Sequence, residues 1–314
     1  MKLVTLPASL DERTFDVMVR GLEGDSDERV LFDAQHVRWV DPCGMVGLLA
    51  VGTVAGRSAE PPLLRLPENA DVVSYLARMS FFEHARGVFD LHGSQKRSHV
   101  EGPSEVLLEI TAINSHADVH AVVDLVNERG MTILTTQLNY PVREAFQFSV
   151  ILSEVCQNII EHAEAPGWVA TQTYNWTRRL GRKVVVIAVM DLGIGFRGSL
   201  APAYAARYPG EHETFGDAAA LEAAFMHGQT RFHDPGRGQG LQQIRKQVAR
   251  WGGRISIRSG TARIADVPDW DDSPVKERDL PHLPGAQIGI VLPARVVTPG
   301  GRAGAAAGAG REEP

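Results

Sequence analysis

The sequence predicts an α/β protein built from two units, because short strand-like apolar runs alternate with stretches of helical period in both halves. A polar stretch with glycine and proline, HGSQKRSHVEGPS at 92–104, separates the two halves. The length of 314 residues and the hydrophobic fraction of 44% agree with two folded units.

The bulk composition narrows the classes of function. The formal net charge is -6, from 32 basic and 38 acidic residues, so we expect no direct binding of nucleic acid through overall charge. Two cysteines, Cys43 and Cys156, lie in apolar helix-like segments, which indicates buried thiols in a reducing compartment. The first residues lack the apolar core of a signal peptide, and the most apolar run, 44–56, is too short to span a bilayer. We therefore expect a cytoplasmic protein with no membrane contact.

The first unit is expected to cover residues 1–92, followed by a linker at 93–104. Three strands and three helices alternate along this unit. The strands are predicted at 2–6, 29–34 and 61–66, and the helices at 11–22, 44–56 and 70–79.

The second unit is expected to cover residues 105–296, and the low-complexity tail at 297–314 is expected to be disordered. Strands are predicted at 105–111, 168–176, 183–193, 252–260 and 285–294, and helices at 116–130, 141–162 and 241–252. The segment 197–235 is predicted to be a long mobile excursion with one short alanine-rich helix, and 264–283 a charged loop.

A first motif lies in the helical stretch SEVCQNIIEHA. Glu154, Asn158 and His162 are spaced four apart and therefore share one face of the helix. Val155 and Ile159 occupy the adjoining apolar sector, so the polar stripe borders the buried face and can point into a cleft. The alternative is a solvated helix edge.

A second motif, MDLGIGF, ends a strongly apolar strand. Asp191 there is followed by Gly193 and Gly195, which allow a ligand to lie close to the backbone. A carboxylate at the end of a buried strand needs a hydrogen-bond donor, and the exocyclic amine of a purine is one. The alternative is an ordinary Asp-Gly turn.

A third motif, DPGRGQGLQQIRKQV, places Gly236, Gly238 and Gly240 directly before a helix. Glycines let the backbone approach a ligand, and the helix start offers N–H groups without partners, so the combination suits a phosphate chain. It is neither a Walker motif nor a dinucleotide fingerprint. The alternative is a glycine-rich loop.

Taken in order, E-x3-N-x3-H-A, D-x-G-x-G and G-x-G-x-G before a helix resemble the GHKL ATPases, which include histidine kinases and anti-sigma kinases. The resemblance covers about 105–296. It implies the Bergerat fold, an α/β sandwich that binds ATP and Mg²⁺ between its helices and a lid, here 197–235. The last strand of the family often opens with Gly-Thr, whereas this chain has Gly285-Ala286, so that contact with the adenine site is expected to differ.

The resemblance also implies roles for the residues of the three motifs. Asn158 would be the Mg²⁺ ligand, Glu154 the general base and Asp191 the acceptor for the adenine amine. The glycines would admit the nucleotide to the backbone: Gly193 and Gly195 at the base, and Gly236, Gly238 and Gly240 around the phosphates.

In the first half, residues 31–56 resemble STAS domains, the fold of anti-sigma factor antagonists. In that family a strand ends in Asp-Ser-Ser-Gly, and the second serine accepts phosphate from an anti-sigma kinase. This chain has Asp41-Pro42-Cys43-Gly44, which puts Cys43 at the phosphoacceptor position. A thiol is a poor stable phosphoacceptor, so the resemblance implies a docking or regulatory unit. The alternative is a generic strand-to-helix junction.

Together the two resemblances imply a regulatory protein of the anti-sigma kind. It would transfer the γ-phosphate of ATP to a serine or threonine of a protein partner, either a STAS-type antagonist or a sigma factor. Related kinases form dimers, so a homodimer is compatible with the resemblance. One alternative is a nucleotide-sensing interaction protein without phosphotransfer. Another is a histidine kinase, but His116 and His120 lie in a segment without a long heptad helix.

Overall fold

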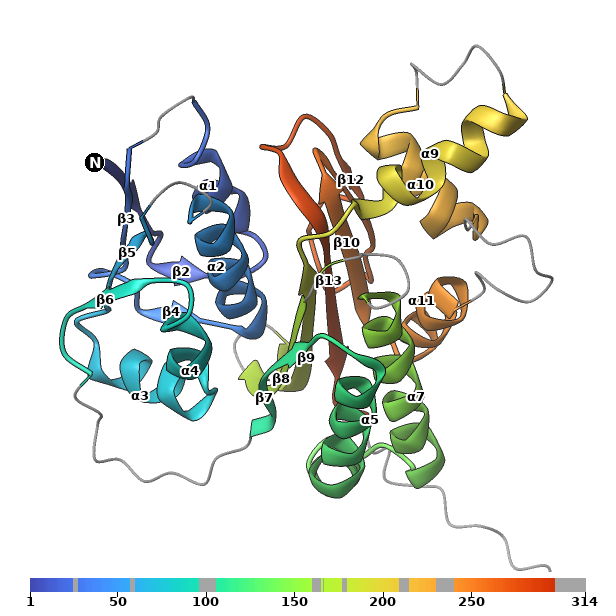
Figure 1. Cartoon of the computed structure of the whole chain (residues 1–314). Coiled ribbons are helices and arrows are strands. Elements are labelled where there is room, and N and C mark those ends of the chain that lie inside the picture. Colours follow the sequence, from blue (N-terminus) through green and yellow to red (C-terminus); the bar gives the residue numbers. More distant parts are fainter. Residues whose placement is uncertain are drawn as a thin grey trace, which may run out of the picture.

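Two β-sheets, one in each half of the chain, organise the protein (Figure 1). The computed structural model describes residues 1–24, 28–56, 60–95, 106–159, 165, 167–176, 180–208, 215–229 and 240–296. Most of the predicted linker and the whole predicted tail lie outside these ranges. The α/β class is confirmed, since both parallel and antiparallel sheets are combined with helices.

The first sheet is parallel, in the order β1-β3-β5-β6. Its strands are β1 (Lys2–Thr5), β3 (Val30–Asp33), β5 (Leu63–Arg65) and β6 (Asp90–His92). A separate parallel pair joins β2 (Ser9–Leu10) to β4 (Trp39–Val40). The three predicted strands are confirmed. The sequence did not indicate the short strands β2, β4 and β6.

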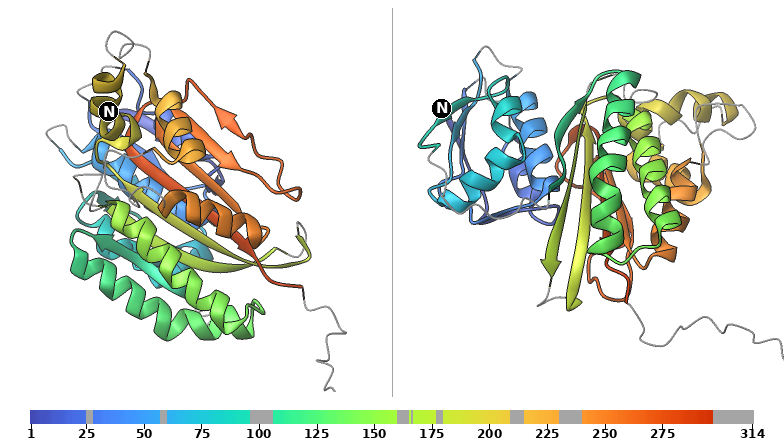
Figure 2. Two further views of the ribbon diagram at one scale, coloured as in Figure 1. Left: turned by 90° about the vertical axis from the view of Figure 1, so that its right-hand side faces the viewer. Right: turned by 90° about the horizontal axis from the view of Figure 1, so that it is seen from below.

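The helices of this half all lie on the side of the sheet that faces the second sheet (Figures 1 and 2). They are α1 (Phe15–Arg20), α2 (Pro42–Ala55), α3 (Ala70–Arg78) and α4 (Phe81–Ala85). Because the strand order follows the chain, successive right-handed crossovers place their helices on the same face. The three predicted helices are confirmed, and α4 was not predicted.

The second sheet is antiparallel throughout, in the order β12-β11-β10-β13-β9-β8-β7. Its strands are β7 (Val106–Ile113), β8 (Gly167–Trp176), β9 (Arg182–Asp191), β10 (Arg254–Gly260), β11 (Ala262–Asp266), β12 (Lys276–Glu277) and β13 (Leu283–Pro293). The five predicted strands are confirmed. The prediction of a loop over all of 264–283 is wrong at 264–266 and 276–277, which belong to the paired strands β11 and β12.

One face of the second sheet is covered by helices of the same half (Figure 1). They are α5 (His116–Leu125), the π-helical turn η1 (Val126–Gly130), α6 (Met131–Thr136), α7 (Val142–Asn158), α9 (Gly195–Arg207), α10 (Asp217–His227) and α11 (Gly240–Arg250). The predicted helices at 116–130, 141–162 and 241–252 are confirmed as far as the structure describes them, and α6 was not predicted. None of the helices in the described part of the chain combines the length and the apolar character needed to cross a membrane.

The short alanine-rich helix predicted within 197–235 is confirmed as α10, but the prediction of an otherwise irregular excursion is wrong where the structure describes it, because α9 covers its first part. Pro202 lies inside α9, a position that argued against a helix from sequence. At the start of α10, the Asp217 carboxylate accepts hydrogen bonds from the Thr261 N–H and hydroxyl, both at 2.9 Å. These bonds attach α10 to the turn between β10 and β11.

The other face of the second sheet packs against the first half of the chain, chiefly against α2. Along β9 the buried side chains alternate between two cores. Toward the first half lie Val184, Val186, Ala188 and Met190, and toward the helices lie Val185, Ile187 and Val189. Because β9 is buried on both faces, its sequence reads as one continuous apolar run. The two halves therefore share a core, and the domain boundaries stay a prediction.

Helix α2 fits between the two sheets because it is apolar all round and rich in glycine. A Cβ at Gly44 would lie 2.1 Å from the Leu10 carbonyl oxygen, and one at Gly47 would lie 2.6 Å from the Phe15 ring. The helix starts with Pro42 at its first position and is capped by Asp41, whose carboxylate accepts from the Gly44 N–H at 2.8 Å.

Buried ion pairs also join the two halves. Glu12 accepts two hydrogen bonds at 2.7 Å from the Arg254 guanidinium of β10. Asp16 of α1 accepts one at 2.8 Å from Arg258 and another from Arg263. Burial would raise the pKa of Glu12, but the charge and hydrogen bonds of Arg254 outweigh it and hold that pKa below its ordinary value. The three arginines thus have carboxylate partners from the other half, as buried charges require.

Candidate functional site

Helix α7 carries the first motif at the border of its buried face. Val155 and Ile159 are 1% and 2% exposed, whereas Glu154 and Asn158 are half-buried. The predicted position of the polar stripe is confirmed for these two residues. His162 lies outside the described residues.

The second motif is held at the end of β9. Asp191 is 7% exposed, and its Oδ1 accepts from the Gly193 N–H at 2.9 Å. Burial raises the pKa of Asp191 to about 6, although hydrogen bonds from the N–H groups of Gly193 and Ala286 act in the opposite direction. The bond to Gly193 is the Asp-Gly turn that the sequence offered as an alternative, and the burial of the carboxyl group goes beyond such a turn.

The end of α7 and the end of β9 lie side by side. In the register of β8 and β9, Gly167 is opposite Asp191. A Cβ at Gly167 would lie 2.9 Å from Cδ1 of Ile159, so the last turn of α7 packs directly on Gly167. Neighbouring strands are about 4.8 Å apart, so Asn158, the residue before Ile159, belongs to the same end of the sheet as Asp191.

The third motif meets the first at Gly240, the first residue of α11. A Cβ built at Gly240 would lie 1.9 Å from Oε1 of Glu154, so this carboxylate lies directly against the glycine backbone. The start of a helix favours a negative charge, because its first N–H groups have no partner within the helix. Gly236 and Gly238 lie outside the described residues.

Two backbone positions fix the loop after β9. Gly195 has φ +65° and Gly285 of β13 has φ +82°, values that side chains other than glycine rarely adopt. A Cβ at Gly285 would lie 2.1 Å from the Asp191 carbonyl oxygen. At Gly285-Ala286 this chain supplies a backbone group, since the Ala286 N–H donates to the Asp191 carboxyl group.

Sequence reasoning missed Ser259, at the end of β10. Its hydroxyl donates to the Gly285 carbonyl oxygen at 2.8 Å and accepts from the Phe196 N–H at 3.1 Å. It therefore ties the loop after β9 to β10 and β13. In RISIRSG, Ser259 follows two isoleucines on the helix-facing side of the strand. A polar residue in this apolar row is the sequence signal that could have indicated its role.

The predicted phosphoacceptor position is buried between the two halves. Cys43 is 1% exposed and is a free thiol, as is buried Cys156, in agreement with the prediction from composition. Burial raises the pKa of the Cys43 thiol, and the nearby Asp41 raises it further. Burial also raises the pKa of Asp41, to about 8.

The Asp41 proton gives a prediction for stability against pH. The folded-state pKa is about 8 and the ordinary value is 3.8, so between these values the folded protein holds a proton that the unfolded chain has lost. The free energy of unfolding is therefore expected to fall as pH rises from 4 to 8, by at most about 1.4 kcal/mol per pH unit. Asp41→Asn keeps the cap and should flatten this slope, so that the variant gains melting temperature relative to the natural chain at pH 8 but not at pH 4. Thermal melts across this range test it, with Asp269→Asn, at an exposed position, as control.

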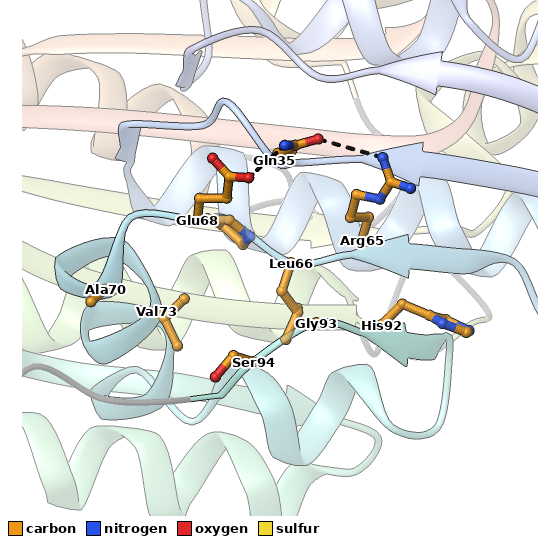
Figure 3. Close-up of a pocket in the computed structure, with 10 residues that line it drawn as sticks. Gln35, Arg65, Leu66, Glu68, Ala70, Val73, His92, Gly93 and Ser94 are labelled. Atoms are coloured by element: carbon orange, nitrogen blue, oxygen red, sulfur yellow. Dashed lines mark hydrogen bonds between the residues drawn. The ribbon is translucent and has the colours of Figure 1, made fainter.

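A cavity of about 690 Å³ lies in the first half, at the carboxyl edge of the parallel sheet (Figure 3). Gln35 bridges two charged side chains on its rim, donating to Glu68 at 2.5 Å and accepting from Arg65 at 3.4 Å. Leu66 and Val73 contribute apolar lining. None of the predicted site residues lines this cavity, so the motifs and the cavity belong to different halves.

The chain matches no known protein-family model, and a search of curated proteins finds none that is similar to it. In the described part of the chain, His, Cys, Asp and Glu side chains form no group of three or more that could hold a metal ion. The site is therefore characterised by the convergence of Glu154, Asn158, Asp191 and Gly240.

Proposed function

We propose that residues 105–296 form a GHKL-type ATP-binding domain, that residues 1–92 form a STAS-like regulatory domain, and that the protein transfers the γ-phosphate of ATP to a serine or threonine of a protein partner. The observation that carries this proposal is the contact of Gly240 with the Glu154 carboxylate, at the same end of the sheet as Asp191. Three motifs separated by many residues thus meet on the helix-covered face.

The residues fit ATP and Mg²⁺ on two structural grounds. Glycine at 240 and 285 lets the backbone lie directly against Glu154 and Asp191 respectively, where a Cβ would clash. Asp191 supplies a buried carboxyl group whose pKa of about 6 leaves it ionised at neutral pH, ready to accept from an exocyclic amine. When bound, Mg·ATP would supply the transferable phosphoryl group and neutralise its charge.

In this proposal each residue has a limited task. Glu154 accepts the proton of the attacking hydroxyl group, which is general base catalysis. Asn158 offers a neutral amide oxygen, a hard ligand suited to a cation that is already shared with phosphate oxygens. The first N–H groups of α11 would hold negative charge of the phosphates. Mg²⁺ would thus be held by Asn158 together with the phosphates.

Glu154→Gln is expected to separate binding from transfer. Mg·ATP should bind with nearly unchanged affinity in calorimetry, because the amide keeps the size of the side chain. Transfer of labelled phosphate to a STAS-domain antagonist with an Asp-Ser-Ser-Gly turn should fall by about 10²–10⁴-fold, since the general base is gone. Glu128→Gln, an exposed position on η1, is the matched control and should transfer normally. Transfer unchanged by Glu154→Gln removes the base role, and no heat with Mg·ATP removes the nucleotide site.

The second candidate is a nucleotide sensor without transfer, and a chain of contacts between α10 and the first half favours it. Asp217 of α10 binds Thr261, and the preceding Gly260 carbonyl accepts from Arg258 at 3.2 Å. Arg258 in turn is paired with Asp16 of the first half. Nucleotide-dependent movement of α10 would therefore reach the interface between the halves. Saturable Mg·ATP binding with no labelled partner would support the sensor, and label in the partner would support the kinase.

A further inference from the structure

The outer face of the first sheet is bare in the described part of the chain. All four helices of that half lie on the inner side (Figures 1 and 2). The inward side chains of Val4, Phe32 and Leu64 are at most 3% exposed. Parallel sheets are normally covered on both faces, so a parallel sheet with one bare face is unusual and suggests an occupant.

The outward side chains form two rows across the four strands, because parallel register places paired residues on the same face. The apolar row is Leu3, Leu31 and Leu63, and it ends in Asp90. The polar row is Thr5, Asp33, Arg65 and His92. Leu3 is 59% exposed, and the Arg65 side chain is 51% exposed.

We propose that this outer face binds the same face of a second copy of the chain, about a two-fold axis that runs parallel to the strands between β3 and β5. Rotation about this axis leaves each row at the same position along the strands but reverses the order of the strands in the second copy. As a result, β3 of one copy faces β5 of the other. Leu31 then meets Leu63 of the second copy, and Asp33 meets Arg65 of the second copy. Two-fold symmetry repeats each contact, so the interface holds two leucine pairs and two ion pairs.

The pattern selects this axis over the other two-fold arrangement of the faces. An axis perpendicular to the strands would place Asp33 against Leu31 and Arg65 against Leu63 of the second copy. That arrangement buries both charges against leucine, with only the Asp33–Arg65 pair within each chain left to them, which is unfavourable.

At the centre of the face, the parallel axis instead sets leucine on leucine and opposite charges on each other. At the rim, Leu3 lies opposite Asp90 of the second copy, and Asp90 keeps its ion pair with Arg29 of its own chain. The polar row of the outer face is thus complementary in charge to the same row of a second copy. This complementarity points to a second copy as the occupant.

The size of the face sets the expected strength. Four strands at 4.8 Å spacing and four residues at 3.3 Å give a face of roughly 19 Å by 13 Å. This is about a third of the area of about 800 Å² per partner found in stable complexes, so the dimer is expected to be weak and to need a high protein concentration. Dimerisation through this face does not depend on the proposed function, because Glu154 and Asp191 lie in the other half.

Charge reversal tests the contact in the full-length chain by sedimentation equilibrium across micromolar concentrations. Asp33→Arg and Arg65→Asp should each weaken dimerisation by about tenfold or more, because like charges then face each other. Mixing the two variants should restore dimers, since both intermolecular pairs become attractive. Mixing leaves the Asp33–Arg65 pair within each chain, at 3.4 Å, unrepaired, so recovery reports on the contact between copies.

Two further variants keep the test independent of folding. Leu31→Ser should weaken dimerisation with little change in melting temperature at low concentration, because the side chain points outward. Glu83→Arg reverses an exposed charge on α4, on the other side of the sheet, and should leave dimerisation unchanged. A natural chain that stays monomeric at hundreds of micromolar overturns the proposal. So does a dimer that is insensitive to Asp33→Arg, Arg65→Asp and Leu31→Ser, or a mixture that fails to recover.

Discussion

Replacing Glu12 by methionine is expected to lower the free energy of unfolding by about 3–5 kcal/mol, because the change leaves the buried Arg254 without its main partner. Glu12 binds both Nη atoms of Arg254 at 2.7 Å and also accepts from the Ser256 hydroxyl. The remaining carboxylate near Arg254 is Asp271, at 3.8 Å, too far to replace a bidentate pair. The loss of this ion pair should weaken the contact between the two halves.

Chemical denaturation measures this effect, and two companion variants interpret it. Glu222→Met makes the same change in a more exposed pair, with Lys276 at 2.8 Å, and should lower the free energy of unfolding by about 1 kcal/mol or less. The double variant Glu12→Met/Arg254→Met removes both charges and should recover most of the loss. If Glu12→Met is no more harmful than Glu222→Met, the pair is not a buried contact of the folded protein.

Gly285→Ala is expected to destabilise the protein by about 2–4 kcal/mol and to disturb the candidate nucleotide site at the same time. The position has φ +82°, which is unfavourable for alanine, and the added Cβ would lie 2.1 Å from the Asp191 carbonyl oxygen. A backbone atom cannot move aside as a flexible side chain can. The end of β9 must shift, and the Asp191 carboxyl group shifts with it.

Gly181→Ala is the matched control for this change. Gly181 has φ +67°, but no heavy atom lies within 4 Å of a Cβ built there, so the variant isolates the backbone strain. It should lower the free energy of unfolding by about 1–2 kcal/mol and leave the stabilisation by Mg·ATP intact. In the Gly285 variant that stabilisation should be lost. Equal destabilisation of the two variants would contradict the close contact with Asp191, whether or not the protein binds ATP.

Local pattern was sufficient for the longer elements. The continuous apolar run of β9 and the stripe of buried residues along α7 follow from periods of two and 3.6 residues, which depend on neighbours in the chain. Short elements were missed because no period develops in a strand such as β4 or a helix such as α4. Helix α9 was missed because Pro202 and several glycines argue locally against a helix that contacts with α10 and β10 stabilise.

The residues of the candidate site likewise divide into those that the sequence predicted and those that it did not. The sequence alone placed Glu154 and Asn158 on one edge of a helix and Asp191 at the end of a buried strand, because helix and strand geometry relate residues a few positions apart. The sequence did not reveal Ser259, nor the backbone contact of Ala286 with Asp191, since β10, β13 and β9 become neighbours only in the folded sheet.

By itself, therefore, the sequence determined the α/β class, the longer helices and strands, and the face of α7 that carries the polar stripe. The tertiary structure alone decided that Gly240 lies against Glu154, that Cys43 lies in the core between the two halves, and that Glu12 is paired with Arg254. The physical reason is distance along the chain. Periodicity is a property of neighbouring residues, whereas close packing and the pairing of buried charges bring together residues that the sequence keeps far apart.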